Sequence, residues 1–242
     1  MEPTVDPQIK LRNRICAIFL AHCYAVEMTQ ENPTVILTSP MLKAMANPLR
    51  RQIFDALGAM RTGRAADIGE LLGIAPNKVS FHLRELAKAE LIEEAPELAR
   101  DKRDRVWKPS ASGFTTGDPT ERTGDESPTT INAYLGQVVH EQQLRLSAML
   151  AHAQYWYAKG EDPKNLASLS TSNLLLTDDE HEELLRRLAD VIPAFREDQK
   201  NGKIKSSQQA SERKLWHYAG MLSLEELLTL PHPGDQSPQN PK

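Results

Sequence analysis

The stretch "GIAPNKVSFHLRELAKAELI", residues 73–92, constrains the fold more than any other part of the chain. Pro76 suits the first turn of a helix, where its missing N–H would have no partner in any case. Val79, Leu83 and Leu86 then recur at intervals of three or four residues and form one apolar stripe. The pattern predicts an amphipathic helix that packs through this stripe and turns its polar side chains outward.

A shorter helix is predicted directly before it. The segment "AADIGELLG" has room for about two helical turns and closes at Gly73, a residue type suited to a left-handed C-cap. Gly69 suggests close packing between the two helices. Two helices joined by a turn of three or four residues make a helix-turn-helix. Upstream, "SPMLKAMANPLRRQIFDALGAM" predicts a short and a longer helix divided at Pro48, because proline restricts the residue before it and lacks the amide.

After the helix-turn-helix, the sequence predicts a β-hairpin. "LIEEA" and "DRVWKPS" have the composition of short strands, and "PELARDKR" forms the loop between them. Basic residues at the tip would suit contacts to a phosphate backbone or a minor groove. These residues are Arg100, Lys102, Arg103 and Arg105. The alternative is a solvated run of charges, since Asp101 and Asp104 are interleaved with them.

Taken in this order, "LKAMANPLRRQIFDAL", "ADIGELLGI", "NKVSFHLRELAKAELI" and "RDRVWKPS" resemble the winged helix-turn-helix of ArsR-type bacterial transcription regulators. The resemblance covers about residues 40–114 and implies a dimeric DNA-binding protein whose second helix enters the major groove. Two departures are visible. Glu90 stands where the family usually has glycine before the wing. "DIGELL" lacks the cysteine pair of metal-sensing members, which argues against thiolate metal sensing there.

The second half predicts a long helix and a further helical module. Residues 131–158 would form a helix of about 40 Å with apolar residues at helical spacing. This stripe can pack within one chain or pair two subunits about a twofold axis, and we favour pairing, which palindromic DNA sites require. "LASLSTSNLLLT" reads as extended. Thr177 and Glu180 form a capping box opening the next helix, in which Pro193 imposes a kink or a stop.

The predicted fold is therefore mostly α with a small β wing, α+β overall. The predicted domains are an N-terminal extension (1–39), the winged helix-turn-helix (40–114), a linker (115–130), a C-terminal helical region for dimerisation and a possible small-molecule effector (131–230), and a disordered tail (231–242). The aromatic run at residues 155–157 is interpreted either as part of an effector pocket or as core and interface.

Charge and cysteine content narrow the function. Residues 1–39 carry 3 basic and 4 acidic residues, residues 40–110 carry 13 and 10, and residues 111–242 carry 13 and 19, so only the middle third is basic. Cys16 and Cys23 have no CxxC spacing, which fits a reducing cytoplasm. His140 and His152 would lie about 120° apart around a helix, so no metal ligation is expected. No GxSxG, HExxH, P-loop or GxGxxG motif is present, and the chain is not expected to be an enzyme or to need a cofactor.

The start of the chain leaves three alternatives open. "LRNRICAIFLAHCYAV" puts basic residues before a short apolar segment, as a secretory signal does, although His22 interrupts it. Translation could instead begin at Met28, or residues 8–27 could form a helix that packs on a partner.

The sequence as a whole predicts a homodimeric, sequence-specific DNA-binding repressor, with no membrane contact. The alternative is a winged helix that binds proteins instead of DNA. Amide and guanidinium groups can contact base edges, an aromatic ring can meet a thymine methyl, and ammonium groups suit phosphates. A structural or phosphate-contacting role is expected of His82. The candidate DNA-binding residues are Asn77, Lys78, Ser80, Phe81, His82, Arg84, Lys102, Arg103 and Arg105.

Overall fold

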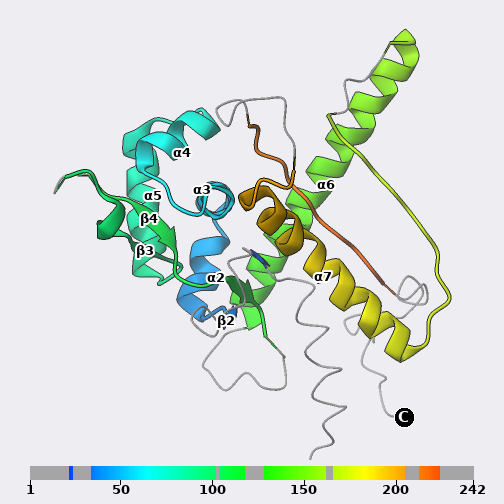
Figure 1. Cartoon of the computed structure of the whole chain (residues 1–242), viewed down its shortest axis with the longest axis horizontal. Coiled ribbons are helices and arrows are strands. Elements are labelled where there is room, and N and C mark those ends of the chain that lie inside the picture. Colours follow the sequence, from blue (N-terminus) through cyan, green and yellow to red (C-terminus); the bar gives the residue numbers. More distant parts are fainter. Residues whose placement is uncertain are drawn as a thin grey trace, which may run out of the picture.

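The structure is a computed structural model that describes the backbone of residues 22–23 and residues 34–101, 104–117, 128–161, 166–204 and 213–223. Helices dominate these ranges, with a small antiparallel β wing, and the predicted fold class is confirmed. Figure 1 shows the four short helices and the wing grouped together, with a long helix leading away from them. The predicted tail at 231–242, the alternatives of a secretory signal and of a start at Met28, and most of the predicted linker lie outside the described residues. The third alternative, a helix over residues 8–27, is wrong at His22–Cys23, which form a β-strand.

Helices α2 (Ser39–Met45) and α3 (Pro48–Met60) confirm the predicted break at Pro48. Asn47 is the N-cap of α3, and its side chain accepts a hydrogen bond from the Arg50 amide at 3.0 Å. Such a bond satisfies one of the amides that a helix start leaves without a partner. Phe54 and Leu57 of α3 are fully buried and anchor the core.

The helix-turn-helix consists of α4 (Ala65–Leu72) and α5 (Pro76–Lys88). Gly73 ends α4 with φ 66°, the left-handed conformation that glycine adopts without strain. At Gly69, an added Cβ would come within 2.5 Å of the Ile74 carbonyl oxygen, so the turn can approach α4 only because no side chain is present. The expected close packing at Gly69 is thus confirmed. Pro76 occupies the first turn of α5 as predicted.

The wing pairs β3 (Ile92–Glu94) with β4 (Trp107–Pro109) in antiparallel register. Gly63 adds a bridge to Trp107 through hydrogen bonds of 2.9 and 3.0 Å. The loop between the strands holds a 3₁₀ turn, η1 (Pro96–Leu98), which the sequence did not predict. Glu90, at the position where the resemblance expects glycine, adopts φ 60°. The backbone there is therefore left-handed, with a glutamate in a conformation that favours glycine.

A second sheet has the strand order β1 (His22–Cys23), β5 (Gly113–Thr115), β2 (Thr34–Ile36). Strand β2 pairs in parallel with β5, and β1 pairs antiparallel with it. Leu37, directly after β2, is fully buried in the core. The sequence placed residues 34–39 in an extension outside the winged helix-turn-helix. In the structure, strand pairing and the burial of Leu37 connect these residues to the core of that domain.

Two long helices follow. Helix α6 (Pro128–Lys159) extends the predicted helix by a few residues at its start. Its first part packs on α2, and Tyr134 is fully buried there. Helix α7 (Asp178–Lys200) begins at the predicted Thr177–Glu180 capping box. It continues through Pro193 to Lys200, so the alternative of a stop at Pro193 is wrong.

Candidate nucleic-acid interface

Helix α5 presents one outward surface, the recognition face, made by side chains that the apolar stripe leaves exposed. At 100° per residue, Asn77, Phe81, Arg84 and Lys88 fall within about 60° around the helix. All four are exposed, and Phe81 exposes 53% of its surface. An exposed phenylalanine beside an amide and a guanidinium gives the recognition face both an apolar and a hydrogen-bonding element. Figure 1 shows α5 beside the β3–β4 wing.

The opposite side of α5 fixes the orientation of this face. Val79, Leu83 and Leu86 are each fully buried against the core, as the periodicity predicted. Burial of three aliphatic side chains stabilises the contact by roughly 1.5–3 kcal/mol each, which holds the helix against rotation. The recognition face is therefore rigid in the domain.

Local hydrogen bonds order the polar side chains at the start of α5. The Lys78 amide donates to Asn77 Oδ1 at 2.8 Å, and Arg84 Nε donates to the Ser80 carbonyl oxygen at 3.2 Å. Ser80 is half-buried at the edge of the recognition face, whereas Lys78 is exposed on its other flank. Five of the predicted site residues thus lie on one side of α5, at the centre or the edge of one surface.

His82 does not share this surface, although it belongs to the same predicted set. It is 9% exposed, and its ring packs edge-on against Phe81 at 5.3 Å between centroids. Burial is the main cause that lowers the pKa of His82 below 6.5; Arg50 and Lys78 lower it further, and Glu85 partly opposes them. Nδ1 has no hydrogen-bond partner in the described residues. His82 thus lies outside the recognition face, and its burial favours the neutral form of the ring.

The wing is less basic than its sequence suggests, because acidic residues pair with its cations. Arg105 Nη1 lies 3.3 Å from Glu94 Oε1, and Lys108 Nζ lies 3.3 Å from Glu93 Oε1. Arg100 is exposed. Two of the predicted wing residues, Lys102 and Arg103, lie outside the described residues. The third predicted wing residue, Arg105, is described, and it already has a carboxylate partner in Glu94.

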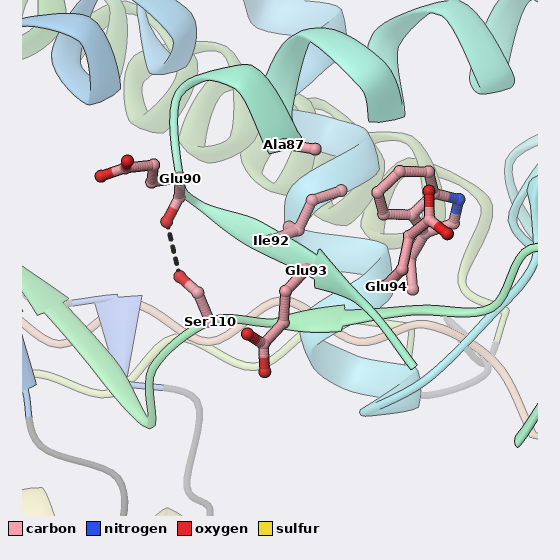
Figure 2. Close-up of a pocket in the computed structure, with 7 residues that line it drawn as sticks. Ala87, Glu90, Ile92, Glu93, Glu94 and Ser110 are labelled. Atoms are coloured by element: carbon pink, nitrogen blue, oxygen red, sulfur yellow. Dashed lines mark hydrogen bonds between the residues drawn. The ribbon is translucent and has the colours of Figure 1, made fainter. Parts of the chain in front are cut away.

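An open hollow lies where the end of α5 meets the wing (Figure 2), and its volume is about 380 Å³. Ser110 Oγ donates to the Glu90 carbonyl oxygen at 2.6 Å and closes one side. The lining of the hollow combines carboxylates with apolar side chains, and this composition disfavours the binding of a phosphate group. The lining residues are Ala87, Glu90, Ile92, Glu93, Glu94, Trp107 and Ser110.

Two residues near the interface, Lys88 and Arg50, are not among the candidate DNA-binding residues that the sequence predicted. Lys88 lies on the recognition face and pairs with Glu85 at 2.7 Å, and its helical spacing from Asn77, Phe81 and Arg84 was the signal that could have identified it. Arg50, on α3, lies close enough to lower the pKa of His82. No local pattern could have indicated this second contact, because it joins different helices.

Two properties of the described ranges bear on other functions. Among the residues placed by the structure, no group of three or more His, Cys, Asp or Glu side chains could hold a metal ion. Within the same ranges, no helix combines the length and the apolar character needed to cross a bilayer.

Comparison with known proteins identifies the same part of the chain. Residues 45–95 match a family model described as a helix-turn-helix domain. Two solved structures of Lactococcus lactis ZitR, a mutant and the wild type in complex with DNA, are each 16% identical to this chain with a TM-score of 0.24. The alignments cover 72% of this chain and 86% of the mutant, and 80% of this chain and 99% of the wild type. No curated protein matches the chain. The family-model match and the β3–β4 wing together show that the chain contains a winged helix-turn-helix domain. The ArsR-type subgroup stays a prediction from the sequence.

Proposed function

We propose that this protein is a transcription regulator that binds double-stranded DNA sequence-specifically as a homodimer and represses by occupying a promoter. The observation that carries the proposal is the recognition face of α5. It joins Asn77, Phe81 and Arg84 on an exposed surface that a buried apolar stripe holds rigid. The match of residues 45–95 to a helix-turn-helix domain supports the same use of α5.

The chemistry of the recognition face suits the edges of bases in a major groove. A guanidinium can donate two hydrogen bonds to guanine, an asparagine amide can bond to adenine, and an aromatic ring can contact the thymine methyl group. In this proposal, Arg84, Asn77 and Phe81 take these three roles. Ser80 lies at the edge of the face, within reach of a base or a phosphate.

Phosphate contacts come from flanking cations. Lys78 lies beside the recognition face, and Arg105 with Lys102 and Arg103 belongs to the wing. Because Arg105 is paired with Glu94, contact with DNA has to replace that carboxylate with a phosphate, so we expect Arg105 to contribute little net affinity. His82 acts indirectly, by packing α5 on α3.

The homodimer is proposed from α6, whose later part carries exposed apolar residues such as Val139, Leu146 and Leu150. Twofold pairing of α6 would cover them and would present two recognition helices to two half-sites. Residues 131–230 would then be the assembly region, and the domain before it would bind DNA.

A second candidate function is a winged helix that binds a protein instead of DNA. The carboxylates of Glu93 and Glu94 favour it, since they neutralise the wing cations and line the hollow in Figure 2. This function predicts no enrichment of any DNA sequence.

The two functions separate in a selection of bound sequences from random DNA with the purified full chain. DNA binding predicts one enriched motif. We then expect Arg84→Ala to weaken binding to that motif by about 1–3 kcal/mol and to relax the preference at one base position. Arg105→Ala is the comparison, since loss of a wing cation should weaken all sequences alike and only slightly.

Each result has a clear consequence. A selection without any enriched sequence would contradict the DNA-binding proposal and leave the protein-binding alternative. A motif whose base preferences are unchanged by Arg84→Ala would reduce Arg84 to a phosphate contact, and base readout would then rest on Asn77, Ser80 and Phe81.

A further inference from the structure

Apolar side chains are distributed unequally between the two halves of the described chain. Every buried hydrophobic residue lies between Leu37 and Tyr134. Of 23 large hydrophobic residues that are exposed, 4 precede Val139 and 19 lie at or beyond it. At on the order of 100 Å² for each half-exposed large side chain, the second half exposes roughly 1,900 Å². Half of that area, about 950 Å², would exceed the roughly 800 Å² that each partner buries in a standard interface.

Helix α6 is apolar on more than one side beyond its contact with the DNA-binding domain. Val139, Leu146, Leu150 and Tyr157 fall within about 40° around the helix, at steps of seven, four and seven residues that keep them in one coiled-coil seam. Leu144 and Tyr155 lie on roughly the opposite side. All six are exposed, with Tyr157 at 88%. A helix that is apolar on several sides is one that several partners cover, so pairing of α6 with a second α6 leaves one side open.

Helix α7 has the complementary form, with one apolar seam and one charged face. Leu184, Leu188, Val191 and Phe195 follow one another at three- and four-residue steps, and no residue of α7 is buried. The opposite face carries ion pairs, in which Glu183 holds Arg186 and Arg187 at 2.8 Å each. These bonds lower the pKa of Glu183 to about 2, so the face stays ionised at any physiological pH. Helix α7 therefore has an inner and an outer side, but none of its residues joins the buried core of the described chain.

The connection to α7 is long and open. Residues 166–176, here called the arm, form no helix or strand. Every residue of the arm is exposed, Leu175 completely. Eleven residues in extended form reach up to about 40 Å, which is enough to leave one subunit and lie on another. Figure 1 shows this segment running along the outside of the molecule from a point beside α6 to the start of α7.

Helices α6 and α7 carry net charges of opposite sign. Helix α7 contains 8 acidic and 4 basic residues, a net charge of −4. Helix α6 contains Glu141, Arg145 and Lys159, a net charge of +1, and also two histidines. An acidic amphipathic helix is thus electrostatically suited to α6 and disfavours a second α7 as its direct partner.

We infer that the arm and α7 of one subunit dock on α6 of a second copy of this chain. The exchanged α7 covers the side of α6 that twofold pairing leaves open, and the two copies of α6 and α7 form one four-helix assembly. Exchange of an identical element between subunits is a low-cost route to dimers, because each contact already has its complement in the same sequence. The inference rests on the proposed homodimer and is independent of DNA binding.

The first test asks which subunit supplies α7. Two differently tagged chains, both with Cys16→Ser and Cys23→Ser, are co-expressed and the mixed dimer is isolated through both tags. One chain carries Leu150→Cys on α6 and the other Val191→Cys on α7, and a short bis-maleimide is added. Exchange predicts a covalent product of twice the chain mass. The control places both cysteines on one chain and none on the other.

A product that forms only when both cysteines are on the same chain, and without increase in mass, would overturn the exchange and show α7 folded back on its own α6. Failure to obtain the mixed dimer would overturn the homodimer itself. Because no DNA is present, neither outcome bears on the DNA-binding proposal.

The second test is a matched pair of lysine substitutions on α7. Val191→Lys places a charge in the apolar seam, and Ala194→Lys places the same charge outside the seam, at an exposed position on the charged face that Glu183 and Arg187 form. Lysine is a good helix former, so neither change should disturb the helix itself. We expect Val191→Lys to raise the dimer dissociation constant at least tenfold by light scattering, and Ala194→Lys to leave it within twofold. Equal effects of the two substitutions would contradict the docking of this seam.

Discussion

Glu141→Ala should destabilise the protein strongly, because it removes the carboxylate that holds a buried arginine. Arg51 of α3 is 3% exposed, and its Nε donates to Glu141 Oε2 at 2.9 Å, while Nη2 also contacts that oxygen. Burial of Glu141 opposes its ionisation, but hydrogen bonds from Arg145 and Arg51 outweigh this effect and lower its pKa. The pair thus joins the DNA-binding domain to α6 as ions.

The expected loss of stability depends on the hydrogen bonds that Arg51 retains after Glu141 is removed. Removing one partner of a buried ion pair costs about 3–5 kcal/mol. Arg51 retains the carbonyl oxygens of Met45 at 3.2 Å and Gln137 at 3.3 Å, and the Glu141 side chain is 26% exposed. We therefore expect a loss of about 2–3 kcal/mol, which corresponds to about 4–12 °C in Tm for a chain of this size.

Urea unfolding followed by tryptophan fluorescence, at one fixed protein concentration, measures this loss. Arg145→Ala is the matched control: it removes the other partner of Glu141, but Arg145 is 41% exposed, so a loss of no more than about 0.5 kcal/mol is expected. The folded-state pKa of Glu141 is lowered, so its contribution is complete above pH 4.5 and disappears as the pH falls through the lowered value. If Glu141→Ala is no more harmful than Arg145→Ala at pH 7, the buried link has no energetic role.

Two further predictions concern single residues of the DNA-binding domain. Glu90→Gly should stabilise the domain by about 1 kcal/mol, since glycine adopts φ 60° without strain. Its control, Lys88→Gly in the regular last turn of α5, should destabilise the domain by a similar amount. Thermal unfolding measures both, and equal effects of the two substitutions would contradict the prediction. For His82, burial, Arg50 and Lys78 lower the folded-state pKa, so below pH 6.5 the unfolded chain binds more protons than the folded one and stability falls. His82→Gln should therefore flatten the loss of stability between pH 7 and about 5, and an unchanged pH profile would show that His82 does not titrate this way.

The features that sequence could predict are those decided within one helix or one turn. The stripe of Val79, Leu83 and Leu86 is visible because 3.6-residue periodicity places them together without any tertiary contact. Gly73 and Thr177 mark helix ends for similarly local reasons. The recognition face follows directly, since the residues opposite a buried stripe have to be exposed.

The features that sequence could not predict depend on partners far along the chain. Strand β2 is only three residues long, and its partner β5 lies almost eighty residues later, so no local pattern distinguishes it from a loop. The burial of Arg51 depends on Glu141, 90 residues away, and a lone arginine in a helix is normally read as exposed. The pairing of Arg105 with Glu94 is likewise a property of strand register, and it changed the interpretation of the wing.

The link between Arg51 and Glu141 also bears on how two DNA half-sites would be read. Arg51 belongs to α3, which packs directly on α5, and Glu141 belongs to α6. A recognition helix joined to α6 through a buried ion pair cannot rotate freely relative to it. If α6 pairs as proposed, the distance between the two recognition helices is then set by the α6 pair and not by DNA. Because rigid dimers bind half-sites separated by about one helical turn or a multiple of it, the enriched sequence should be a palindrome of one fixed spacing. Glu141→Ala should then broaden the tolerated spacing while leaving the half-site sequence unchanged. A spacing preference as narrow as that of the unmodified protein would show that another contact sets the geometry.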